Sequence, residues 1–73
     1  MKIIAKKHAK SKVKISLYKK GYTLKSFAQD VMKKTEQHIG NVIRGKSNPS
    51  PEIAKQIAEE LHLKWEDVWE MVE

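Results

Sequence analysis

Four polar residues in the middle of the chain, Gln37, His38, Asn41 and Arg44, have the types and spacing of a hydrogen-bonding surface. On a helix they fall opposite an apolar stripe spaced i, i+3, i+4, so one face would be buried and theirs exposed. Gln and Asn amides donate and accept at once, as the edge of adenine requires, and Arg adds a cation. This pattern favours the reading of base edges over catalysis. The apolar stripe consists of Ile39, Val42 and Ile43.

Catalytic and metal chemistry have weaker support. His38 has no second His, carboxylate pair or nucleophile in register with it, and Ser47, His62 and Asp67 are not spaced as a catalytic unit. We therefore expect no enzyme, no metal site and no cofactor. The plain alternative to base reading is that Gln37, His38 and Asn41 form an ordinary solvated helix face.

The composition describes one small basic domain. The chain has 73 residues, no Cys, a net charge of +6 and a pI near 9.7, which favours nucleic acid as a partner. Residues 1–48 hold 13 of the 15 Lys and Arg and two acids, whereas residues 49–73 hold two Lys and seven acids. We expect the first part to face phosphates, unless the asymmetry arose by chance. No apolar run suits a membrane span or a signal peptide, so a cytoplasmic location is expected.

Five short helices are predicted by apolar spacing and by start and stop signals. The first runs from about Ser11 or Val13 to Lys20, with Val13 and Leu17 facing inward, joined by Ile15 and Tyr18. Gly21 ends it. The second begins at Thr23, and Met32–Lys34 forms the following turn. Its expected buried stripe is Leu24, Phe27, Ala28 and Val31.

The remaining three helices have similar signals. Thr35 caps the third helix, which ends near Arg44 before Gly45-Lys46. Ser50-Pro51 starts the fourth, which ends near Leu61. The fifth is predicted from about Lys64 by apolar residues at i, i+3, i+4, i+7. These are Trp65, Val68, Trp69 and Val72.

The first 12 residues are Lys-rich and lack a helical stripe. We treat residues 1–12 as a basic N-terminal arm and residues 13–73 as the domain, with helices two and three at about 23–44. The arm can be disordered, a short strand or an early turn of helix. A basic arm can lie along phosphates or enter a minor groove, or simply solubilise the terminus.

A set of short motifs gives the chain a family resemblance. The motifs are Gly21-x-Thr23, Phe27-Ala28, Ile39, Val42, Arg44-Gly45-Lys46, Asn48-Pro49-Ser50 and Ile57-Ala58-x-x-Leu61. With them the chain resembles the Cro/C1-type (Xre-like) helix-turn-helix domain over about residues 11–70, which implies an all-α, five-helix, lambda-repressor-like fold. Members of that family are bacterial and phage transcription regulators that usually bind palindromic operators as dimers. The loop and the size are most similar to short regulators of temperate phages and mobile elements.

The resemblance implies that the third helix enters the major groove of double-stranded DNA. Phosphate contacts fix position and base contacts give specificity. The implied base-contacting residues are Glu36, Gln37, His38 and Asn41. The implied phosphate-contacting residues are Thr23, Lys25, Ser26, Arg44, Lys46, Ser47 and Asn48.

Two features depart from the family pattern. The stretch Val31–Thr35 lacks the usual Gly and is one residue longer than the family's turn, which can tilt or shift the third helix. Glu36 places an acid at the tip of that helix, where it can accept a hydrogen bond from cytosine N4 and otherwise repels DNA.

Two functions are therefore compared. The first is a sequence-specific DNA-binding regulator of the phage repressor or Cro type, dimeric on its operator. The second is a modulator of repression, or antirepressor, of the same fold that binds a partner repressor. The longer turn, the absence of a separate oligomerisation segment within the chain and the acidic, Trp-bearing last third motivate the second. Trp65, Trp69 and Val72 are either core residues or a protein interface.

Overall fold

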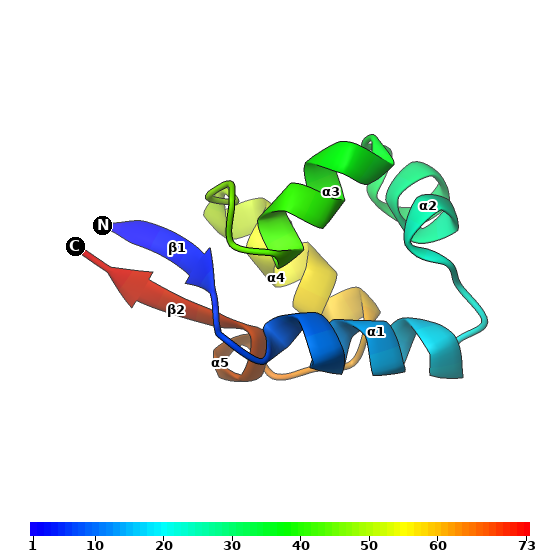
Figure 1. The fold of residues 1–73 in the computed structure, drawn as a ribbon, viewed down its shortest axis with the longest axis horizontal. Coiled ribbons are helices and arrows are strands. Elements are labelled where there is room, and N and C mark those ends of the chain that lie inside the picture. The colour runs from blue at the N-terminus through cyan, green and yellow to red at the C-terminus, as the bar shows by residue number, and fades with distance from the viewer.

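In the computed structural model, which describes residues 1–73, helices form the body of the molecule and a two-stranded sheet closes one end. The two strands lie side by side, and both chain termini lie at their outer tip (Figure 1). The predicted five helices are present, with a sheet that the sequence did not predict. The elements are β1 (Lys2–Ala5), α1 (Ala9–Lys19), α2 (Leu24–Ser26), the π-helix η1 (Phe27–Met32) that continues α2, α3 (Glu36–Ile43), α4 (Pro51–Glu60), α5 (Trp65–Val68) and β2 (Trp69–Val72).

Hydroxyl caps start three of the helices where the sequence predicts them. The side-chain oxygens of Thr23, Thr35 and Ser50 each accept a hydrogen bond from the backbone N–H three residues ahead. Each cap satisfies an amide that has no partner inside its helix. The donors are the N–H groups of Ser26, His38 and Ile53, at 3.0, 3.1 and 3.2 Å.

The first helix begins earlier than predicted and buries fewer residues. It starts at Ala9, so Lys10 to Lys12 belong to it rather than to an arm. Val13 and Leu17 are buried as predicted, but Ile15 is 56% and Tyr18 86% exposed. The expectation that Ile15 and Tyr18 face inward was wrong. Only one side of α1 packs against other elements, and these two side chains do not lie on that side.

The second helix changes its hydrogen-bonding pattern midway. After one α-helical turn it continues as η1 and ends at Lys33, whose φ is 58° and ψ 38°, in the left-handed region. A π-turn spans one more residue per hydrogen bond than an α-turn, so η1 has room for the extra residue that the resemblance implies in this stretch. The wider turn brings Met32, predicted to lie in a turn, into the core with Phe27 and Ala28, whereas Val31 is only half-buried.

The N-terminal segment is a strand, one of its three predicted alternatives. β1 pairs antiparallel with β2 in the register Lys2↔Val72 to Ala5↔Trp69. The Lys6 N–H extends the ladder by donating to the carbonyl oxygen of Val68 at 2.8 Å. Ile3 and Trp69 point into the protein and are buried.

This pairing corrects the prediction for the last helix. α5 is a single turn that ends at Val68, and Trp69 has extended backbone angles of −119° and 156°. A short apolar run can be read as helix or strand from its spacing alone. The strand wins here because β1, from the opposite end of the sequence, supplies its backbone hydrogen-bond partners. Val72 therefore lies on β2 and not on a helical stripe.

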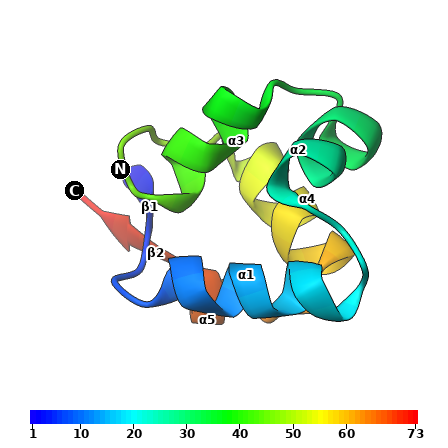
Figure 2. The same ribbon diagram turned by 45° about the vertical axis from the view of Figure 1, so that its right-hand side comes forward.

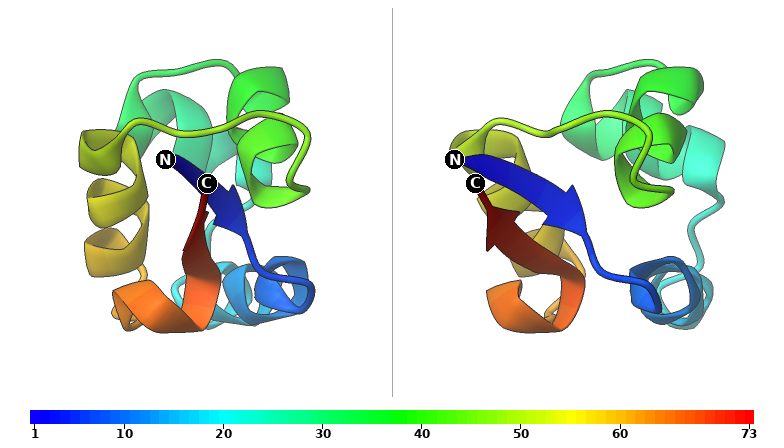
Figure 3. Two further views of the ribbon diagram at one scale, coloured as in Figure 1. Left: turned by 90° about the vertical axis from the view of Figure 1, so that its left-hand side faces the viewer. Right: turned by 60° about the vertical axis from the view of Figure 1, so that its left-hand side comes forward.

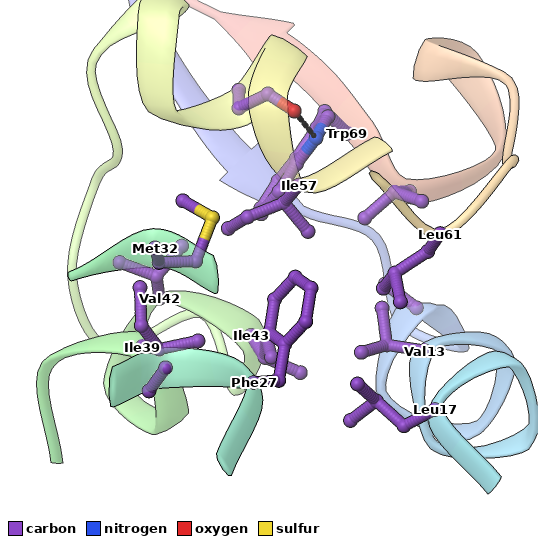
Figure 4. Close-up of a cluster of buried hydrophobic side chains, with 14 of the residues drawn as sticks. Val13, Leu17, Phe27, Met32, Ile39, Val42, Ile43, Ile57, Leu61 and Trp69 are labelled. Atoms are coloured by element: carbon purple, nitrogen blue, oxygen red, sulfur yellow. Dashed lines mark hydrogen bonds between the residues drawn. The ribbon is translucent and has the colours of Figure 1, made fainter. Parts of the chain in front are cut away.

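One apolar cluster joins all of these elements. Side chains from α1, η1, α3, α4 and β2 meet around Phe27 and Ile57 (Figure 4). The one polar group of Trp69 is satisfied, because its indole Nε1 donates to the carbonyl oxygen of Ala54 at 2.9 Å. No buried side-chain N or O atom lacks a hydrogen-bond partner.

The arrangement leaves α3 at one side of the molecule. α3 and α1 run along opposite sides, with α2 at the end away from the sheet (Figure 2). Seen from the sheet end, the strands lie between α4 on one side and α3 and α1 on the other (Figure 3). The longest helix has 11 residues, and none combines the length and apolar character needed to cross a bilayer.

Candidate nucleic-acid interface

The polar face of α3 lies on the surface, as predicted. Glu36, Gln37, His38 and Arg44 are exposed and Asn41 is half-buried. The opposite face is fully engaged in the core. α3 is therefore held rigidly by its buried stripe while its amide and imidazole groups remain available to a partner. The buried stripe consists of Ile39, Val42 and Ile43.

Arg44 folds back along its own helix. Its Nη2 donates to Asn41 Oδ1 at 3.1 Å, and its guanidinium covers Gly40. A Cβ placed on Gly40 would lie 3.1 Å from Arg44 Nη2, so the missing side chain gives the guanidinium its place. The bond leaves the amide NH₂ of Asn41 free to donate, and the amide oxygen keeps the second of its two acceptor lone pairs. Asn41 therefore retains both the donor and the acceptor that a paired contact to adenine uses.

The loop after α3 is tied to the same residue. The backbone N–H groups of Lys46 and Ser47 both donate to the carbonyl oxygen of Asn41, at 2.9 and 3.3 Å. Gly45 has a φ of 80°, which other residues rarely adopt, and it makes this tight return possible. Lys46 and Asn48 are exposed and Ser47 is half-buried. The three predicted phosphate-contacting side chains of the loop thus lie close to the end of α3.

At the start of α2, the predicted phosphate contacts differ in what they can donate. The Thr23 hydroxyl donates to Ser26 Oγ at 3.2 Å, and the Ser26 hydroxyl donates to the Thr23 carbonyl oxygen at 3.1 Å. Both hydroxyl protons are therefore used inside the capping box. Lys25 is exposed and has no ion pair, so it keeps its three donors for a phosphate.

The structure adds cations that the sequence analysis did not single out. Lys33 and Lys34 line an open hollow together with Thr35 and His38, beside the first turn of α3. The signal was present in the sequence as two lysines directly before the cap, but they were read only as a turn. A second addition comes from α1, where Lys10 and Lys14 line the same cavity as Arg44.

Few of these cations are neutralised within the protein. The ion pairs are Lys12–Asp67 and Lys55–Glu59, each at 3.8 Å, and neither includes a cation near α3. Unpaired cations can replace the counterions of a nucleic-acid backbone. No group of three or more His, Cys, Asp or Glu comes together that could hold a metal ion.

The three residues of the possible protein interface, Trp65, Trp69 and Val72, do not form one exposed surface. Trp69 is completely buried, so of its two predicted alternatives the structure has the core one; its ring packs in the core and its indole N–H donates to the Ala54 carbonyl oxygen. Trp65 is half-buried against the core, and Val72 is 36% exposed on β2 beside Met71, which is 52% exposed.

Comparison with known proteins gives one match. A family model described as helix-turn-helix matches residues 17–68, from the second half of α1 to the end of α5. The match includes α2, η1, α3 and the loop that follows. Searches of curated proteins and of solved structures found no match.

Proposed function

The chain belongs to the Cro/C1-type helix-turn-helix family, and from this premise we propose that it is a sequence-specific, DNA-binding transcription regulator of the phage repressor or Cro type. In this proposal α3 enters the major groove of operator DNA. The protein works in the cytoplasm, without catalytic activity and without a cofactor.

The observation that carries the proposal is the surface of α3. Amide and imidazole side chains, Gln37, His38 and Asn41, stand on a rigid helix, and unpaired cations stand at both of its ends. Lys33 and Lys34 precede the helix, whereas Arg44 and Lys46 follow it. Neutral hydrogen-bonding groups read base edges, and the flanking cations supply affinity for the backbone.

The roles divide by chemistry. Gln37 and His38 have free side-chain polar groups in the first turn of α3, where helices of this kind reach base edges. Glu36 accepts from cytosine N4 if a cytosine faces it. Lys25, Lys46 and Asn48 contact phosphates, as does the side chain of Ser47. Thr23 and Ser26 stabilise the first turn of α2 through the capping box. Their hydroxyl protons are already donated there, so these side chains donate to a phosphate only if the capping box opens.

The test begins with selection of duplexes from a random library, followed by affinity measurements for the selected site and for a scrambled one at two salt concentrations. We expect Gln37→Ala to lose about 1–3 kcal/mol of discrimination between the two sites. Gln56→Ala on α4, which is half-buried and lies outside the proposed surface, is the matched control. Equal loss of affinity for both duplexes in Gln37→Ala would refute base reading.

We propose that the regulator binds its operator as a homodimer, because one α3 of eight residues reads too few bases for a unique site. Sedimentation of the protein with a selected duplex measures the stoichiometry. Two chains per palindromic duplex are expected, and one chain at saturation would exclude the dimer.

The alternative is a modulator of the same fold that binds a partner repressor. Its remaining support is the exposed apolar pair Met71 and Val72 on β2, next to Glu70 and Glu73 in the acidic last third. Size-exclusion chromatography with the repressor encoded beside it tests this. A complex that is lost in Met71→Glu, combined with no preference for any selected duplex, would favour the modulator.

A further inference from the structure

A small cavity opens between α1 and α3 and has no role in the function proposed above. Its volume is about 180 Å³, and its walls come from α1, the first residue of α2 and α3. The floor is apolar and the rim is cationic. The floor residues are Val13, Leu17, Leu24 and Ile43, and the rim residues are Lys10, Lys14 and Arg44.

Gly40 keeps the cavity open on the α3 side. It is the remaining lining residue, and because it has no side chain the Arg44 guanidinium can lie over it. Arg44 uses one donor on Asn41 Oδ1. A guanidinium has five N–H donors, so donors remain for a ligand at the mouth of the cavity.

The lining chemistry selects the charge of a ligand. Three cations and no acid surround the cavity, and none of the three has an ion pair elsewhere. An anion is therefore favoured at the rim. The floor consists of Val, Leu and Ile side chains, which offer no hydrogen bond, so the part of the ligand that enters must be apolar.

The volume selects the size of the ligand. Pockets for drug-sized ligands span about 300–1,000 Å³, which is larger than this cavity. An apolar cavity of about 150 Å³ in another protein holds benzene. One ring or a short chain therefore fits here, with its charged group left outside among the cations.

We propose that this cavity binds a small carboxylate with an apolar body the size of one ring, and that this ligand weakens DNA binding. The carboxylate pairs with Arg44, which lies at the C-terminal end of α3, next to the proposed base-reading residues. It draws the guanidinium away from a DNA phosphate. Ligand and DNA oppose each other equally by linkage. Binding of the carboxylate is independent of the proposed function, and only its effect on DNA rests on it.

The binding test uses the free protein and needs no DNA. Backbone amide and methyl NMR shifts are followed during titration with sodium benzoate, with benzyl alcohol and with sodium phosphate. We expect saturable shifts centred on the floor residues and Gly40 with benzoate, and at least about fivefold weaker binding of the other two probes. Equal binding of benzyl alcohol, shifts spread over all lysines, or no saturation with benzoate would overturn the proposal.

Two variants locate the site. Gly40→Ala adds a methyl group whose nearest neighbours are the atoms at the far, flexible end of the Arg44 side chain, so the fold is kept while the cavity mouth is filled. Lys14→Gln removes a rim charge from an exposed position. Both are expected to weaken benzoate binding about fivefold or more, whereas Lys55→Gln on α4 leaves it unchanged. Unchanged benzoate binding in both variants would contradict the site.

The DNA arm separates the two proposals. With a selected duplex, saturating benzoate is expected to lower DNA affinity about fivefold or more, and Gly40→Ala is expected to lose this sensitivity. Failure to find any selected duplex concerns the proposed function alone, since the NMR result stands without it. Benzoate that binds the cavity without changing DNA affinity would overturn the coupling.

Discussion

Arg44 Nη2 donates to Asn41 Oδ1 at 3.1 Å, one turn apart on the exposed side of α3. In the proposed function, the bond joins a cation that contacts phosphates to an amide that distinguishes bases. It also fixes which end of the Asn41 amide faces outward, since the oxygen is the end that Arg44 holds. The proposed function therefore implies that sequence reading and backbone anchoring are coupled through one hydrogen bond.

This coupling predicts non-additive effects on DNA binding. Asn41→Ala should lower the preference for the selected duplex by about 1–3 kcal/mol, whereas Arg44→Ala should weaken all duplexes and reduce the salt slope by about one. Because the two side chains are bonded, the double variant should differ from the sum of the single ones by about 0.5 kcal/mol or more. Fluorescence anisotropy at four salt concentrations measures each term. Lys55→Ala is the matched charge control, and strict additivity would show that the bond is absent when DNA is bound.

The buried Trp69 predicts a large effect on stability. Trp69→Ala removes the largest fully buried side chain and leaves the Ala54 carbonyl without its indole donor. The free energy of unfolding should fall by about 3–5 kcal/mol. Urea denaturation followed by circular dichroism measures it. Trp65→Ala provides the comparison, since Trp65 is only half-buried and should cost clearly less; the reverse order would contradict the burial of Trp69.

The pairing of β1 with β2 predicts that the first residues contribute to stability. Ile3 is 6% exposed and packs in the core. Ile3→Ala should therefore destabilise the protein by about 2–5 kcal/mol, which a loose arm would not do. Ile15→Ala on the exposed side of α1 should change stability by no more than about 0.5 kcal/mol. The two variants are compared by thermal and urea unfolding, and equal midpoints would mean that residues 1–5 are not docked.

Local signals sufficed for the middle of the molecule. Helix caps and the apolar stripe of α3 depend on residues within four positions of each other, so the sequence predicts them. The caps are Thr23, Thr35 and Ser50. The polar face of α3 followed from the same spacing. The sheet did not, because β1 and β2 are stabilised by each other across almost the whole chain length. Trp69 could be assigned to core or surface only once its strand was known.

The cations around α3 show a second limit of sequence reading. Arg44 was identified because it lies on the helix itself. Lys10 and Lys14 join it only through the packing of α1 against α3, and no local pattern predicts that packing. The sequence shows that Lys33 and Lys34 are cations, but it does not predict that they lie beside the first turn of α3. That position depends on the π-helical end of the second helix.

The left-handed backbone of Lys33 yields the last prediction. A residue with a side chain costs about 1–2 kcal/mol in this conformation, and glycine does not. Glycine in turn makes the unfolded chain more flexible, at a cost of about 0.4–1 kcal/mol. Lys33→Gly should therefore stabilise the protein by up to about 1 kcal/mol, measured by urea denaturation. Lys34→Gly is the neighbouring control: it lacks the positive φ and should be neutral or destabilising. If Lys33→Gly were the less stable of the two variants, the left-handed end of η1, and with it the accommodation of the extra residue, would be wrong.

DNA affinity of the same two variants also separates conformation from charge. Each removes one cation beside α3, so both should lower affinity for all duplexes to a similar degree.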